Sequence, residues 1–333
     1  MLVATLFTAI TLIPNLLAQP LVNIETVTVG DAGNASDATG YGAVSDVFAI
    51  GKYEVTIGQY TTFLNSVASV TSDSYIVDLW SANMAGNLNV TGISRSGSGT
   101  LVSPYSYSVI GSGNRPITYV SWFDAARFAN WVNNGATNGA STETGAYELS
   151  GATTGVITRN TGATWWIPNE DEWYKAAYYK SGGTNAGYWL YPTQSDTAPG
   201  NTTGGASNQA NYYAGDFAIT QSASYSSSQN YLTDAGAFSN SPSAYETFDQ
   251  GGNVWEWNDA VSDSSRGLRG GSWLNLDDVA GLQSSYRVVT APTDEDFGNR
   301  GFRVASVPEP STYALILLSG AGWMFWKRRN FTL

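Results

Sequence analysis

The stretch FDQGGNVWEW, residues 248–257, carries the most informative pattern in the chain. It combines two tryptophans, two carboxylates and two adjacent glycines, and neither helical nor strand periodicity fits it well. Adjacent glycines permit a positive φ or a close approach of the backbone. Asp249 and Glu256 bracket a turn whose carbonyl oxygens can join them around a hard cation. Spacing alone favours a structural turn clamped by the tryptophans, with a metal site as the alternative.

The composition removes several kinds of chemistry. The 333 residues include no cysteine and no histidine, which excludes disulfides, thiolate metal sites, histidine-ligated metals and Ser-His-Asp triads. Charged residues make up only 13%, aromatic residues another 13%, and there are 36 glycines. This composition is typical of a loop-rich globular protein and differs from that of a helical bundle or a disordered chain.

The charge balance bears on the partners. There are 27 acidic residues against 15 basic ones, which gives a formal net charge of −12. Such a surface repels nucleic acid and anionic lipid head groups, so we expect no nucleic-acid partner. It suits cations, or polyhydroxyl ligands that stack on aromatic side chains.

Both ends of the chain have the pattern of targeting segments. Residues 1–18 are apolar and precede a polar chain, which indicates a signal peptide cleaved near Ala18; a buried N-terminal strand is the alternative. Residues 307–311 read VPEPS, and an apolar run at 313–326 precedes the basic residues 327–329. This run is short for a full membrane span.

The C-terminal order over residues 307–330 resembles the PEP-CTERM sorting signal of Gram-negative bacteria. The resemblance implies recognition and removal by an exosortase, with transient association of residues 313–326 with the inner membrane. It also implies export to the cell surface or the extracellular matrix. An ordinary C-terminal membrane anchor is the alternative.

The region between the two ends reads as one domain over residues 22–306. We expect three capped helices, starting after Thr56, Ser121 and Asn169 and covering residues 57–67, 122–133 and 170–180. Alternating or β-rich runs predict strands at residues 22–29, 47–55, 146–149, 164–168, 267–273 and 301–305. Residues 73–113 are expected to form a meandering insertion, and residues 182–245 mostly loop.

Five sequence blocks agree in order and spacing with one family. They are YEVT (53–56), PITYVSWFDA (116–125), IPNEDEW (167–173), GNVWEW (252–257) and LRGGSW (268–273), closed by GFR (301–303). Together they resemble the formylglycine-generating enzyme family, also called the sulfatase-modifying factor domain. The resemblance covers most of residues 22–306. It implies an α+β, modified C-type-lectin-like fold, loop-rich with small twisted sheets and a few helices.

The same resemblance implies calcium and makes it the preferred interpretation of the 248–257 stretch. One site would take the Asp249 side chain, the Gly252 and Val254 carbonyls and the Glu256 carboxylate, an all-oxygen set that Ca²⁺ prefers. A second family site begins at an Asn followed by an apolar residue, which Asn211 and Tyr212 match. The remaining ligands of that second site do not align with residues 222–230.

The family's oxidase chemistry is not expected here. The family holds copper through two cysteines that follow the Gly-Gly-Ser-aromatic block, and Asn275 stands where the first would be. Copper(I) has no soft ligand pair in a chain without thiolates, so we expect no copper and no formylglycine formation. Asn275, Asp277 and Asp278 occupy the equivalent of the family's groove. For Asp277 and Asp278 a solvated loop is the preferred interpretation; binding of a cation or a sugar hydroxyl is the alternative.

Other charged residues have structural interpretations. Arg269 and Arg303, each beside an aromatic residue, are expected to be buried structural arginines. Acidic residues 170–172 are expected to cap a helix and to interact with its dipole.

Three functional hypotheses follow. The first is an exported, calcium-stabilised binding protein without oxidase activity, whose partner is an extracellular polysaccharide or a matrix protein. The second is an enzyme of the same family with altered chemistry that needs no cysteine. The third is a structural matrix protein with no specific ligand.

Overall fold

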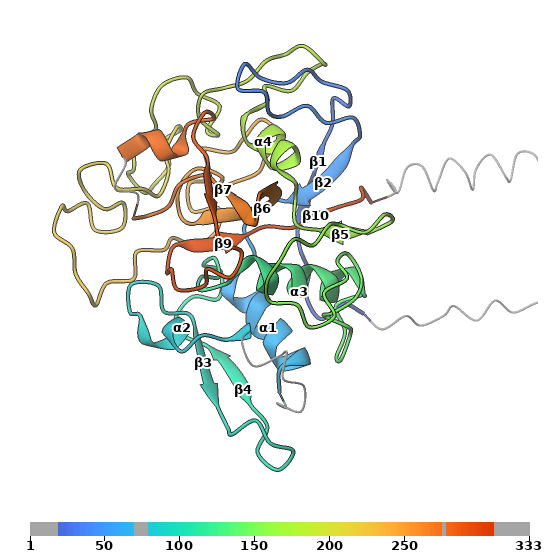
Figure 1. Cartoon of the computed structure of the whole chain (residues 1–333). Coiled ribbons are helices and arrows are strands. Elements are labelled where there is room, and N and C mark those ends of the chain that lie inside the picture. The colour runs from blue at the N-terminus through green and yellow to red at the C-terminus, as the bar shows by residue number, and fades with distance from the viewer. Residues whose placement is uncertain (1–18, 70–78, 275–277, 310–333) are drawn as a thin grey trace, which may run out of the picture.

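The structure, a computed structural model, describes residues 19–69, 79–274 and 278–309. As expected, it is a loop-rich α+β fold with short helices and small sheets (Figure 1). The helices are α1 (Ile57–Val67), α2 (Asn83–Gly86), α3 (Trp122–Asn133), α4 (Glu170–Tyr178) and the 3-10 helix η2 (Asp278–Leu282). The strands are β1 (Thr26–Val29), β2 (Phe48–Gly51), β3 (Ile93–Ser96), β4 (Ser106–Val109), β5 (Trp165–Trp166), β6 (Trp255–Ser262), β7 (Ser265–Arg269), β8 (Val288–Thr290), β9 (Arg300–Phe302) and β10 (Ala305–Ser306).

The strands form three sheets. One has the order β1-β2-β10-β5, the second is the β3–β4 hairpin, and the third has the order β8-β7-β6-β9 with β9 parallel to β6. In the first sheet the last strand pairs antiparallel with β2, so the beginning and end of the domain lie together. Figure 1 accordingly shows both ends of the described chain emerging on the same side.

The three expected helix starts are confirmed. Thr56, Ser121 and Asn169 each accept a hydrogen bond from the backbone N–H three residues later, and a side chain returns the bond in each case. Helices α1 and α3 then pack through aromatic rings, with the Phe63 and Phe128 centroids 5.4 Å apart. These capping boxes fix where each helix begins, and the buried rings fix how the two helices meet.

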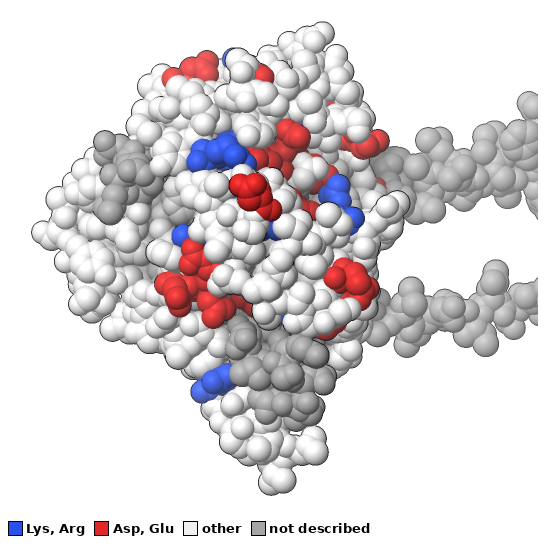
Figure 2. Space-filling view, in the orientation of Figure 1, with Lys and Arg blue, Asp and Glu red and all other residues white. Residues whose placement is uncertain are grey.

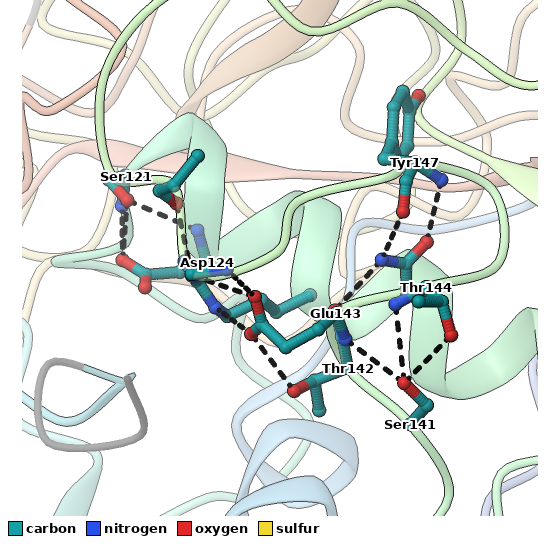
Figure 3. Close-up of polar contacts among 11 residues, drawn as sticks. Ser121, Asp124, Ser141, Thr142, Glu143, Thr144 and Tyr147 are labelled. Atoms are coloured by element: carbon teal, nitrogen blue, oxygen red, sulfur yellow. Dashed lines mark hydrogen bonds and ion pairs between the residues drawn. The ribbon is translucent and has the colours of Figure 1, made fainter. Parts of the chain in front are cut away.

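The loop after α3 replaces one predicted strand (Figure 3). Residues 146–149 form no strand beyond a bridge between Tyr147 and Arg159. The reason is a side chain: the Asn130 amide donates to the carbonyls of Thr142 and Tyr147 and accepts from the Tyr147 N–H at 2.7 Å. The Arg127–Glu143 ion pair, at 2.7 Å, secures the same loop. The backbone groups that a strand would have paired are therefore satisfied by α3.

Other predicted strands are present but shorter or shifted. The β-rich runs at 22–29, 47–55 and 164–168 contain β1, β2 and β5, respectively. The run at 267–273 starts and ends earlier, as β7, and its partner β6 has a bulge between Asn258 and Val261. Strand β6 includes Trp255 and Trp257 from the 248–257 stretch. Periodicity missed it because all four of its first residues are buried, so no polar face alternates with an apolar one.

None of the helices within the described ranges is long and apolar enough to cross a membrane. The predicted signal peptide, residues 1–18, and the apolar run at 313–326 lie outside the described residues.

Candidate functional site

The glycine pair of the 248–257 stretch is buried. Gly252 has φ +88° and donates its N–H to the Gly270 carbonyl at 2.8 Å. The next residue, Asn253, donates its N–H to the Asn211 carbonyl at 2.7 Å, and its side chain accepts from the Asn211 amide at 3.0 Å. It also donates to the Glu54 carboxylate at 3.2 Å. The structure therefore links Gly252, from the first predicted calcium site, and Asn211, from the second, through Asn253 in one buried polar network.

Glu256 is fully buried and fully engaged. Arg303, also 0% exposed, donates to both of its carboxylate oxygens at 2.6 Å, and the Trp173 indole adds a bond at 2.8 Å. The same guanidinium donates to the carbonyls of Gly51 and Phe248. This is the two-pronged geometry that gives arginine–carboxylate pairs their strength. The expectation that Arg303 is a buried structural arginine is thus confirmed.

Asp249 and Glu54 lack such a cation of their own. Burial raises the pKa of Asp249 to about 6. The hydrogen bond from the Gly236 N–H and the charge of Arg303 lower this pKa but do not cancel the effect of burial. Burial also raises the pKa of Glu54 well above its usual range, and the carboxylates of Asp249 and Glu256 raise it further. One oxygen of Glu54 has no hydrogen-bond partner. The network therefore holds two carboxylates that are costly to ionise.

The calcium ligands expected around Gly252 fit the ion only in part. Glu256 does not fit, because both of its oxygens face a guanidinium whose positive charge repels a second cation. Asp249 fits better, since its carboxylate accepts a hydrogen bond from the Gly236 N–H and is not held by a guanidinium on both oxygens. Within the described ranges, no three acidic side chains converge in a way that would hold a metal ion.

The residues predicted to begin a second calcium site have other partners. The Asn211 amide donates to the Tyr231 carbonyl at 2.9 Å as well as to Asn253. The Tyr212 hydroxyl donates to the Pro199 carbonyl, and its ring is buried. Both residues therefore hold the surrounding loops in place.

The predicted ligand groove follows Trp273. Asn275 and Asp277 lie outside the described residues, and Asp278 begins η2. Before the groove, the Ser272 hydroxyl accepts a bond from the Asn299 amide at 3.1 Å. With no cysteine anywhere in the chain, the thiolate copper site of the family is absent.

The acidic start of α4 holds a second ion-pair network. Glu170 pairs with Arg269 and Arg287 at 2.8 Å each, and Glu172 pairs with Arg159 at 3.1 Å. Capping was predicted for these acids, but the arginines that they bind were not. Arg269 and Arg287 come from the other end of the domain, so no local pattern could have identified them, whereas Arg159 lies 13 residues before Glu172. The prediction that Arg269 is buried and structural is confirmed.

The surface carries acidic and basic residues side by side (Figure 2) and has a cavity beside α4. On the face shown in Figure 2, basic and acidic residues lie next to one another in small clusters, and wide uncharged areas separate these clusters. A cavity of about 560 Å³ opens next to the start of α4, between Asp46, Arg159 and Asp171. Arg159 covers the Trp166 ring at 4.6 Å, so this tryptophan presents little free surface to a ligand.

Fold, core and missing thiols together define a class: an α+β, formylglycine-generating-enzyme-like domain without the copper cysteines. The family model described as "Sulfatase-modifying factor enzyme 1-like domain" matches residues 26–307, and the chain belongs to this family. The PEP-CTERM protein-sorting motif matches residues 306–329. This motif implies an exported surface protein that an exosortase processes.

Solved structures with a similar fold share little sequence with the chain. CarF is 19% identical, over 86% of this chain and 99% of its own, with a TM-score of 0.46. Treponema denticola variable protein 1 is 17% identical, over 86% and 96%, with a TM-score of 0.45. PvdO from Pseudomonas aeruginosa is 18% identical, over 86% and 92%, with a TM-score of 0.40. No curated protein matches the chain.

Proposed function

We propose that the protein is an exported binding protein of the cell surface or matrix that has no oxidase activity. One observation carries the proposal: the scaffold is retained, with its helix caps and buried ion pairs, while the chain has no cysteine. Selection for copper oxidase chemistry would retain the thiolates. A scaffold kept without them supports a role that its surface performs, and the sorting motif supports a role outside the cell.

Coexpression with a sulfatase and binding to native matrix together test this proposal. Mass spectrometry of the sulfatase is expected to show no formylglycine that depends on this chain, with a cysteine-containing member of the family as the positive control. The purified domain is expected to bind matrix material from the source bacterium. Chain-dependent formylglycine, or failure to bind any matrix component, would overturn the proposal.

We infer that calcium, when it binds at this loop, takes Asp249 and the carbonyls of Gly252 and Val254, while Glu256 stays with Arg303. The support is the contrast between the two acids: Glu256 is neutralised by a guanidinium, whereas Asp249 has a raised pKa. A bound divalent cation would favour the ionised form of Asp249.

Calcium is therefore expected to raise the melting temperature of the wild type but not that of Asp249→Asn. Ligand binding to the folded state stabilises it by mass action, and the asparagine removes the charge while it keeps an acceptor for the Gly236 N–H. Melting curves in millimolar calcium and in EGTA measure the effect. If calcium does not shift the wild-type curve, this site is excluded.

Without calcium, the free energy of unfolding is expected to fall as the pH rises from about 4 to about 7. The folded state holds the protonated form of Asp249 more tightly than the unfolded state, whose pKa is about 3.9. That contribution is complete below the unfolded pKa and is lost as the pH passes through about 6. A shift of the pKa from about 3.9 to about 6 corresponds to about 3 kcal/mol.

Urea titrations at several pH values in EGTA measure this dependence. Asp249→Asn is expected to reduce the pH dependence of the free energy of unfolding. Glu54→Gln should reduce it further, because Glu54 also has a raised pKa. Glu148→Gln, at an exposed carboxylate, is the control and should leave the profile unchanged. A wild-type profile that rises over the same range would contradict the assignment.

A further inference from the structure

Three aromatic rings form a column that runs from the core to the surface. The Trp273 ring is parallel to that of Tyr231, with an angle of 3° and a centroid distance of 5.0 Å. Tyr231 in turn stacks on Tyr225 at 13° and 5.9 Å. The two inner rings are buried, at 4% and 1% exposure, whereas Tyr225 is 56% exposed. The column thus ends in one broad aromatic face that is open to solvent.

The exposed ring is held rigidly. The Tyr225 hydroxyl donates to the side-chain oxygen of the buried Asn89, whose amide donates to the carbonyls of Ser226 and Gln229 at 2.8 Å each. The Ser226 N–H donates to the Tyr231 hydroxyl, also at 2.8 Å. Hydrogen bonds therefore hold the loop that carries Tyr225 against the buried residues Asn89 and Tyr231. An aromatic ring fixed in advance loses little conformational entropy when a ligand stacks on it.

The surroundings of the ring define the chemistry of its ligand. Residues 217–233 contain no acidic or basic side chain, in a protein with a net charge of −12. Exposed serine hydroxyls flank Tyr225, at positions 224, 226, 227 and 228. A flat apolar face bordered by neutral hydroxyls complements a sugar ring, which presents C–H groups on one face and hydroxyls at its edge. An anionic polymer or a basic peptide would find no counter-charge here.

The position of the column also suits a ligand outside the cell. The loops between residues 200 and 240, yellow in Figure 1, lie on the side opposite to that from which both ends of the chain emerge. The sorting motif begins at residue 306, at one of those ends. A domain held at that end therefore presents the loops between residues 200 and 240 away from its point of attachment (Figure 1).

We propose that Tyr225, supported by Tyr231 and Trp273, is a stacking surface for a neutral polysaccharide. This inference rests on the proposed binding function and names its ligand class. The neighbouring serines contact sugar hydroxyls, and Asn89 is a positioning residue that holds the tyrosine ring.

Affinity electrophoresis of the domain in gels containing dextran or galactomannan, with alginate as the anionic comparison, tests the proposal. The wild type is expected to be retarded by at least one neutral polymer, and Tyr225→Ala is expected to weaken that binding about tenfold. Tyr225→Phe should retain most of the binding, because the ring remains. Phe297→Ala removes another exposed aromatic ring, 45% exposed, and should bind like the wild type.

The outcomes separate this inference from the proposed function. If the wild type binds native matrix and Tyr225→Ala binds equally well, the stacking surface is wrong while the binding function stands. Binding to alginate or to a matrix protein alone would likewise overturn the saccharide assignment. If the wild type binds nothing, both proposals fail. Circular dichroism of each variant verifies that the domain is folded, since Tyr225 lies at the surface and its loss leaves the core intact.

Discussion

Replacing Arg303 by methionine is expected to lower the free energy of unfolding by about 3–5 kcal/mol. The substitution leaves the Glu256 carboxylate buried, with the Trp173 indole as its remaining partner. It also removes donors from the carbonyls of Gly51 and Phe248. Breaking one side of a buried pair is costly because the other charge stays desolvated. Urea denaturation followed by tryptophan fluorescence measures the loss.

Two comparisons make this expectation specific. Lys52→Met breaks the exposed pair with Glu25, which lies at 2.7 Å, and should cost no more than about 1 kcal/mol. The double variant Glu256→Leu, Arg303→Met removes both buried charges and should be less destabilised than Arg303→Met alone. Because the guanidinium rather than a metal neutralises Glu256, EGTA should not change the loss. A loss below 1 kcal/mol for Arg303→Met would contradict the role given to the pair.

The helices were predictable because their signals are local. A Thr, Ser or Asn followed three residues later by Gln, Asp or Glu is a pattern that one turn of helix satisfies by itself. Boundaries at the start of α1, α3 and α4 therefore agree with the sequence. The strands were less predictable because each is short and its partner is distant. Strand β10, for example, is placed between β2 and β5 by pairing that no local pattern encodes.

The same distinction applies to the candidate site. The sequence placed Asp249, Gly252 and Glu256 in one turn, and Gly252 does take the positive φ that its glycine pair allows. What it did not show is that Arg303, 47 residues beyond Glu256, occupies that carboxylate. The aromatic column was missed for a similar reason. Tyr225 and Tyr231 share one loop, but Trp273 lies more than 40 residues further on, and only tertiary packing brings it under Tyr231.

Gly252→Ala is expected to cost more than about 3 kcal/mol, because two effects act at this position. The φ of +88° is strained for any residue with a Cβ, which costs roughly 1 kcal/mol. A Cβ at Gly252 would also lie 2.3 Å from the Asn211 carbonyl oxygen, a backbone atom that cannot turn away. To relieve the overlap, the segments around Asn211 and Gly252 must move apart. That movement also breaks the hydrogen bond from the Asn253 N–H to the Asn211 carbonyl.

Gly182→Ala isolates the first effect from the second. The φ of Gly182 is +89°, and a Cβ there would meet nothing within 4 Å. This variant should therefore lose only the free energy of unfolding that backbone strain costs. The difference between the two variants in the free energy of unfolding then measures the close approach at Gly252, and we expect at least about 2 kcal/mol. Equal losses would mean that the Asn211 segment moves freely. In that case the 248–257 stretch would not be the rigid segment on which the proposed calcium ligands and the Glu256–Arg303 pair depend.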